Sequence, residues 1–130
     1  MFEFEVKKSH IHSRGLFAIS ALPARRKLGE MTGRLISARE AKRYAQRRCI
    51  KLVEFGDGWA LDATRDSNCF QYVNHSCTPN LYMRCFGHRV EFYSLRAIAA
   101  GEELTCDYGD TQHEGKLRCR CKSPGCRRWL

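Results

Sequence analysis

Hydrophobic and polar positions along this chain follow the pattern of many short strands. Residues 2–7 alternate apolar and charged side chains, as a strand with one exposed face does. Apolar runs bounded by turn residues predict further strands within 13–19, 20–37, 50–55, 59–63, 82–86, 90–95 and 104–106. Turns at Pro23 and at Gly29 or Gly33 divide the 20–37 segment, and glycine turns at 56–58 and 87–89 form two hairpins. The chain is therefore expected to be mostly β.

One segment departs from this pattern and predicts a helix. Ser37 and Glu40 form a capping box, in which Ser37 accepts a hydrogen bond from the Glu40 amide and Glu40 reaches back. The helix should run from 38 to 47 or 48, and its basic end suits the helix dipole. Periodicity alone does not distinguish a small barrel from another arrangement of short strands.

Charge is distributed unevenly over the 130 residues, which predict a single domain with a net charge of +9. Residues 25–51 hold ten Lys or Arg against Glu30 and Glu40, whereas residues 97–115 hold five acidic side chains and no basic one. The basic region suits contact with nucleic acid or another polyanion, or it is a solvated surface that keeps the protein soluble.

The eight cysteines indicate a metal site. We expect no signal peptide and no membrane contact, because no apolar run approaches the length of a membrane span. The expected location is therefore an intracellular, reducing compartment, where clustered cysteines usually bind metal. The cluster is Cys119, Cys121 and Cys126, with a tight turn at 123–125. These are three thiolates, and structural zinc takes four ligands. We expect four other cysteines to be small hydrophobic residues of the core and not ligands: Cys49, Cys69, Cys85 and Cys106.

Two polar motifs carry the candidate chemistry. In 72–81, apolar residues lead into an unbroken run of Asn, His, Ser and Cys that ends at Pro79. In 101–109, a Gly-Glu-Glu-Leu-Thr-Cys run is followed by Asp107, Tyr108 and Gly109. Together with the cysteine-rich end, and in this order, these motifs resemble the SET-domain lysine methyltransferases. The chain looks most like the minimal stand-alone members with a cysteine-rich post-SET tail.

The resemblance implies an architecture: a β-clip of short sheets with a pseudoknot and one short helix, plus a small zinc-bound C-terminal post-SET segment. The SET catalytic domain would span 1–110, and the zinc-binding tail would span 111–130. In the family, the cysteine of the Asn-His-Ser-Cys motif supplies the fourth zinc ligand. That cysteine corresponds to Cys77, so the implied metal ligands are Cys77, Cys119, Cys121 and Cys126.

The resemblance also implies a reaction, in which a methyl group moves from S-adenosylmethionine to a lysine and S-adenosylhomocysteine is the product. Tyr108 is the candidate catalytic residue, orienting the amine for in-line transfer. The implied cofactor-binding residues are Arg14, Gly15, Leu16, Gln71, Asn74, His75, Tyr108, Trp129 and Leu130. The implied residues of the lysine channel are Met31, Tyr72 and Cys106.

Four positions depart from the family pattern: Ser13, Met31, Gln71 and Cys106. Met31 replaces a common channel tyrosine, and Cys106 is smaller than the usual Phe or Tyr, so the site is expected to proceed beyond monomethyl-lysine. The expected substrate is a basic protein such as a histone, a histone-like protein or a ribosomal protein. The alternative is a catalytically weak SET-fold module that binds nucleic acid or a protein partner through 25–51.

Overall fold

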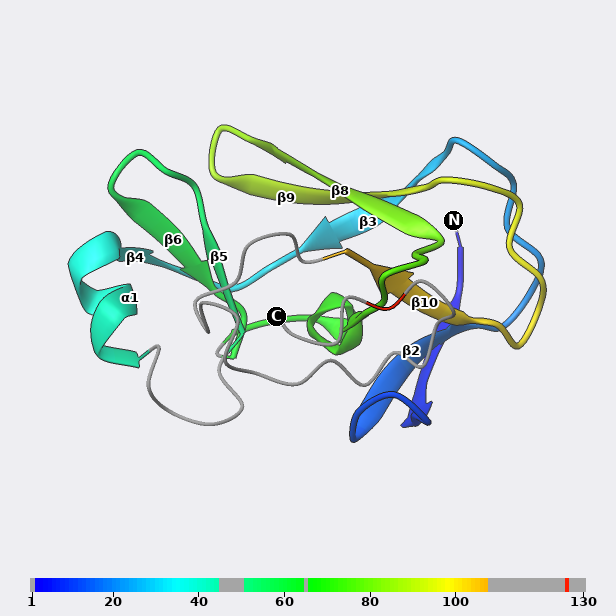
Figure 1. Cartoon of the computed structure of the whole chain (residues 1–130). Helices are drawn as coiled ribbons and strands as arrows, with labels where there is room; N and C mark the ends of the chain where they lie inside the picture. Colours follow the sequence, from blue (N-terminus) through cyan, green and yellow to red (C-terminus); the bar gives the residue numbers. More distant parts are fainter. Residues whose placement is uncertain (1, 45–50, 65, 108–125, 127–130) are drawn as a thin grey trace.

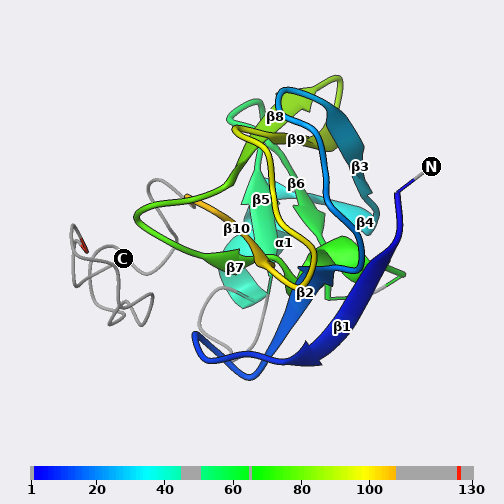
Figure 2. The ribbon, with the colours of Figure 1, turned by 90° about the vertical axis from the view of Figure 1, so that its right-hand side faces the viewer.

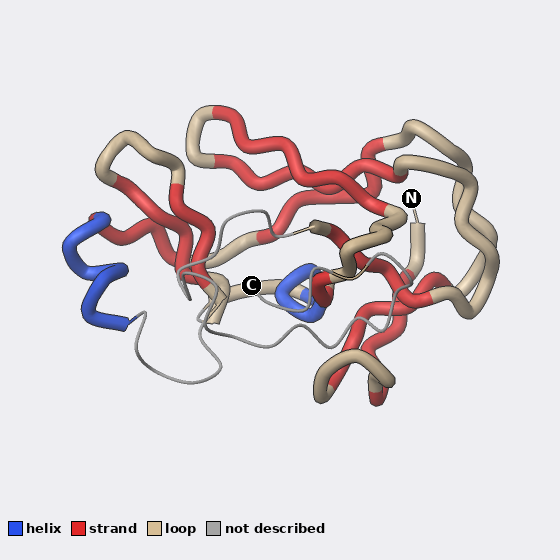
Figure 3. Tube along the Cα trace, in the orientation of Figure 1, coloured by secondary structure: helices blue, strands red, loops and turns tan. Residues whose placement is uncertain are grey.

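The computed structural model describes residues 2–44, 51–64, 66–107 and 126 (Figure 1). Strands dominate, and helix is confined to two short segments (Figure 3). The elements, in chain order, are β1 (Phe4–Lys8), β2 (Arg14–Ala18), β3 (Lys27–Met31), β4 (Arg34–Ser37), α1 (Ala38–Tyr44), β5 (Leu52–Glu54), β6 (Trp59–Asp62), the 3-10 helix η1 (Cys69–Tyr72), β7 (Asn74–His75), β8 (Leu81–Phe86), β9 (Arg89–Ser94) and β10 (Glu103–Cys106).

Strand β10 lies at the centre of the larger sheet, whose order is β1-β2-β10-β8-β9-β3 with β7 paired to β10. It runs antiparallel to β2 on one side, and parallel to β7 and β8 on the other. Figure 2 shows β2, β7 and β10 gathered at one end of the molecule. Strand β10, late in the described chain, is therefore inserted between a strand from the first third of the sequence and strands from the middle third.

A second sheet, of order β4-β6-β5, lies with α1 at the other end of the molecule (Figure 1). The Glu40 amide donates to Ser37 Oγ over 3.1 Å, which confirms the predicted N-terminal cap of α1. Ile36, Ala41 and Ala60 form a small buried cluster between the helix and this sheet.

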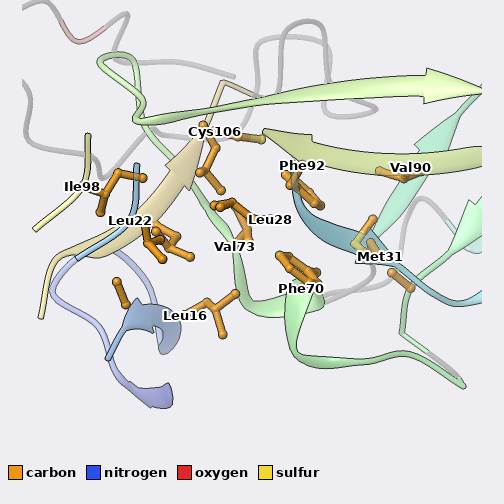
Figure 4. Packing of buried hydrophobic residues seen from close by; sticks show 14 of the residues in the cluster. Leu16, Leu22, Leu28, Met31, Phe70, Val73, Val90, Phe92, Ile98 and Cys106 are labelled. Atoms are coloured by element: carbon orange, nitrogen blue, oxygen red, sulfur yellow. The ribbon is translucent and has the colours of Figure 1, made fainter. Parts of the chain in front are cut away.

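The main core is a continuous apolar cluster beneath the larger sheet (Figure 4). Phe70, from η1, stacks on Phe92 with ring centroids 5.4 Å apart, and it meets Phe4 edge-on at the same centroid distance. Gly29 allows this packing, because a Cβ there would lie 2.5 Å from the Phe70 ring. Burying aromatic rings in this way makes the short η1 segment a major contributor to the core.

The mostly β fold with one α-helix is confirmed, and so are both hairpins. Of the two turn positions left open, Gly33 lies between β3 and β4, whereas Gly29 lies inside β3. Residues 69–72, for which no element was predicted, form the 3-10 helix η1. One prediction was wrong: Cys85 is exposed instead of buried. The predicted helix end at 47 or 48, and the 110/111 domain boundary, lie outside the described residues. Within the described residues, no helix is long and apolar enough to cross a lipid bilayer.

Candidate functional site

The pairing of β10 brings the two polar motifs together. Thr105 pairs with Asn74, and Cys106 pairs with His75, in a parallel ladder. The Ser76 amide extends this ladder by donating to the Cys106 carbonyl over 3.1 Å. On the opposite side of β10, Leu104 pairs with Leu16 of β2. Segments 14–16, 74–76 and 104–106 therefore lie on adjacent strands.

The Asn74 side chain is almost fully buried, with 3% of its surface exposed. Its amide nitrogen lies within hydrogen-bonding distance of the His12 and Arg14 carbonyls, at 3.1 and 3.0 Å, and of two side-chain oxygens. An amide nitrogen has only two protons, so these acceptors share them. No described residue donates to the Asn74 Oδ1 atom. The nitrogen thus secures the β1–β2 loop, and the oxygen is the part of the side chain left to bind another group.

Glu103 holds the same loop from β10. Its carboxylate accepts from the Ser9 hydroxyl, at 2.8 and 2.9 Å, and from the Asn74 amide nitrogen at 3.0 Å. It also occupies the space that a side chain at position 15 would need, because a Cβ on Gly15 would lie 2.4 Å from Glu103 Oε2. Because Gly15 has no side chain, the Glu103 carboxylate can occupy the space beside its backbone.

His75 lies between a thiol and a carboxylate. Its ring is 4% exposed, its Nε2 atom is 3.3 Å from Cys77 Sγ, and its Nδ1 atom is 3.8 Å from Asp107 Oδ1. Cys77 is half-buried. The ring therefore connects the end of the central motif to the residue that follows β10 and precedes Tyr108.

Asn80 fixes β10 from the other side. Its Oδ1 accepts from the Thr105 amide, and its Nδ2 donates to the Glu103 carbonyl, each over 2.8 Å. These bonds satisfy two buried-strand backbone groups of β10 with a side chain. Asn80 is 3% exposed, as expected for a buried polar group with satisfied hydrogen bonds.

The three predicted channel residues share one apolar environment. Met31 and Cys106 are buried in the main core (Figure 4). Tyr72 packs against this core. Burial, reinforced by the Asp107 carboxylate, raises the pKa of Cys106 to about 12, so this residue is a neutral thiol at physiological pH. Beside Tyr72, the Lys51 ammonium lies 4.9 Å from the ring centroid and hydrogen-bonds to the Gln71 carbonyl.

Comparison with known proteins decides the family. The SET domain family model matches residues 13–109, which include both motifs and every strand from β2 to β10. The chain belongs to the SET domain family.

Named relatives of this SET domain are histone methyltransferases. The chain is 37% identical to the histone-lysine N-methyltransferase trithorax of Drosophila virilis over 96% of its own length and 4% of that protein. It is 33% identical to H3 lysine-4 specific histone-lysine N-methyltransferases of Mycosarcoma maydis and Schizosaccharomyces pombe, covering 98% and 94% of this chain. It spans only 10% and 14% of those two proteins, so it is similar to a small part of each relative.

Several predicted residues of the SET site lie outside the described residues: Tyr108, Cys119, Cys121, Trp129 and Leu130. Cys126 is described and half-buried. Among the described residues, no group of three His, Cys, Asp or Glu side chains is arranged to hold a metal. The zinc site and the catalytic tyrosine therefore remain predictions.

Sequence reasoning did not identify Ser9, Asn80 and Glu103 as site residues. Asn80 is the last residue but one of the central motif and Glu103 is the third residue of the second one, so both stood beside residues that were singled out. Ser9 had no local signal. It is 94 residues from Glu103 in the chain, and only the β2–β10 pairing brings the two together.

Proposed function

We propose that this chain is an S-adenosylmethionine-dependent protein-lysine N-methyltransferase. The observation that carries the proposal is the parallel pairing of Asn74 and His75 with Thr105 and Cys106. This pairing brings the predicted cofactor-binding motif alongside the strand that leads to Tyr108. A methyl donor and an acceptor amine have to be held in line, and alignment of this kind is worth about 7–11 kcal/mol in well-oriented systems.

The residues fit the polar end of the cofactor. S-adenosylmethionine carries an ammonium group, and the anchored Asn74 amide presents its Oδ1 as a hydrogen-bond acceptor. We propose that Asn74 and His75 contact this end of the cofactor together with the backbone of Arg14, Gly15 and Leu16. Gln71 is a further proposed contact, with its Nε2 atom donating to the Asn68 carbonyl over 3.3 Å. We propose that Trp129 and Leu130 cover the adenine.

The acceptor lysine must react as a neutral amine. A free lysine has a pKa of about 10.4, and an apolar channel beside a sulfonium cation lowers it. Tyr72, Met31 and Cys106 provide apolar surroundings in this structure. The amine then loses its proton to water, and the Tyr108 hydroxyl orients its lone pair toward the methyl group. Much of the rate enhancement would come from this orientation.

A zinc ion is proposed for Cys77, Cys119, Cys121 and Cys126. The donor set fits, because four thiolates make a closed tetrahedral zinc site. The Cys77 thiol lies 3.3 Å from His75 Nε2, so binding at Cys77 would fasten the C-terminal tail next to the cofactor motif. The ion would be structural, and the thiols would need a reducing compartment.

We propose that the substrate is a basic protein such as a histone, because the relatives are named histone-lysine N-methyltransferases. Part of the charge pattern is neutralised within the fold. Glu102 pairs with Arg96, and the Lys27 ammonium lies 3.0 Å from a Glu30 oxygen and 2.7 Å from a Glu91 oxygen. Asp107, beside His75, has 42% of its side chain exposed near the site. The compensated charge in β3 gives no specific support to nucleic-acid binding as the principal function.

The test is incubation with methyl-labelled cofactor and a panel of basic proteins, comparing wild type with Tyr108→Phe. A matched control is Tyr93→Phe, because Tyr93 stacks on Tyr82 in the β8–β9 hairpin at a centroid distance of 5.2 Å. We expect label on a lysine of at least one basic protein. Labelling should fall strongly in Tyr108→Phe and stay unchanged in Tyr93→Phe. The absence of cofactor binding by calorimetry would contradict the proposal.

A further inference from the structure

Lys51 is fixed in the backbone just before β5. Its amide donates to Thr64 Oγ1 over 3.1 Å, and its carbonyl accepts from the Ala63 amide over 2.8 Å. These two bonds hold the Lys51 main chain against the end of β6. Its side chain extends from this fixed point to η1.

The Lys51 ammonium contacts a backbone carbonyl and an aromatic ring, two groups that recognise a lysine head. It donates to the Gln71 carbonyl and lies over the Tyr72 ring, 4.9 Å from the centroid. A carbonyl accepts a hydrogen bond from the ammonium, and an aromatic face attracts the cation. Aromatic faces also bind methylated ammonium groups, so the product of a methylation would still fit beside Tyr72.

Tyr72, the residue beneath this ammonium, is two residues before Asn74 of the proposed cofactor motif. One residue, Val73, separates Tyr72 from Asn74, and the Val73 amide bonds to the Phe70 carbonyl over 3.1 Å to end η1. β7 then begins at Asn74 and pairs with β10. Lys51, a lysine of the same chain, therefore contacts Tyr72, the residue proposed to line the lysine channel.

We propose that Lys51 is a self-methylation site, modified by the molecule that carries it. The inference rests on the proposed methyltransferase function. In the step, the deprotonated Lys51 Nζ attacks the methyl carbon of the sulfonium donor. The new N–C bond forms as the C–S bond breaks, S-adenosylhomocysteine leaves, and the proton lost from the amine goes to water. The main-chain anchors at Ala63 and Thr64 hold the acceptor near the site, which favours reaction within one molecule.

The experiment uses the full chain with labelled S-adenosylmethionine and no added substrate, followed by intact mass measurement and peptide mapping. The variants are Lys51→Arg, which keeps the cation and its hydrogen bond, and Lys42→Arg as a control on the exposed surface of α1. We expect methyl groups on Lys51 in wild type and in the control, and complete loss of that label in Lys51→Arg. The first-order rate constant should be unchanged by an about tenfold dilution, as for an intramolecular reaction.

The outcomes separate this inference from the proposed function. Methylation of basic proteins with an unmodified Lys51 would overturn the inference and leave the proposed function standing. Label on Lys51 whose rate falls with dilution would overturn the intramolecular step. No label on Lys51 or on any basic protein would refute both.

Discussion

Substitution of Gly15 tests the clamp that Glu103 places on the β1–β2 loop. In Gly15→Ala the new Cβ would lie 2.4 Å from Glu103 Oε2 and 2.9 Å from its Cδ. The carboxylate is the end of a flexible side chain, but its bonds to Ser9 and Asn74 resist displacement. Hydrogen bonds to charged groups are worth about 1.5–3 kcal/mol each, and partial exposure reduces this value.

We expect Gly15→Ala alone to lower the free energy of unfolding by about 1–3 kcal/mol, after the gain of about 0.5–1 kcal/mol from replacing glycine within a strand. Gly15 pairs with Lys7 within the β1–β2 ladder, and its φ lies outside the range that disfavours alanine. The cost should therefore come from the displaced Glu103 side chain. In a Glu103→Ala background that cost should disappear, and Gly15→Ala should be neutral or slightly stabilising.

The assay is urea unfolding of the four proteins of this double-mutant cycle, with calorimetry of S-adenosylmethionine binding on the same samples. Gly29→Ala is the matched control, because its Cβ would meet the Phe70 ring and not Glu103, so its effect should be additive with Glu103→Ala to within about 0.5 kcal/mol. An equal cost of Gly15→Ala with and without Glu103 would refute the reasoning. Retained stability with lost cofactor binding in the double variant would instead show that the backbone of Gly15 approaches the ligand.

Four further predictions follow from the site. Chelation of zinc, or Cys121→Ser, should abolish cofactor binding while circular dichroism of the β core persists; metal-free protein that binds the cofactor normally would contradict this. At neutral pH, iodoacetamide should modify exposed Cys85 and spare buried Cys106, whose raised pKa keeps it a thiol, until the protein unfolds. The hydrogen bond from Arg96 lowers the pKa of Glu102 in the folded protein. The charged carboxylate therefore stabilises the fold at neutral pH, and this stabilisation is lost as the pH falls below about 4.3 and through the lowered pKa of the folded state. In Glu102→Gln, the melting temperature should depend less on pH over this acidic range. Mass spectra at exhaustive turnover should show di- or trimethyl-lysine, because Cys106 leaves more room than Phe or Tyr, and a purely monomethyl product would contradict this.

Local pattern predicted the hairpins and the helix start, because each depends on neighbouring residues. The turn at Gly87 and His88, both with positive φ, joins β8 to β9 as the apolar alternation indicated. Propensity did not identify η1, since its four residues gain their stability from Phe70 packing on β9 and β1. The sequence left open whether Gly29 or Gly33 makes the turn, because the ring that fills the space at Gly29 is distant in the chain.

The candidate site shows the same division between local and distant information. Asn74 and His75 could be selected from a polar run that is unusual in a packed chain. The partners that orient Asn74 could not, because Ser9 and Glu103 reach it only after β10 is inserted beside β2 and β7. A motif read from sequence identifies the side chains that meet a ligand. The residues that hold those side chains still depend on strand order, and strand order is decided by non-local pairing.

The charge pattern shows how such pairing changes the interpretation of a sequence. By charge alone, the acidic 97–115 segment would attract a cationic substrate, yet its first two carboxylates serve the fold. Glu102 accepts from the Ala99 amide over 2.9 Å and pairs with Arg96, and Glu103 clamps Ser9. A carboxylate engaged in this way contributes little to attraction at a distance, because its charge is offset by a bonded partner or directed inward. Neither glutamate should therefore contribute much to steering a basic peptide toward β10.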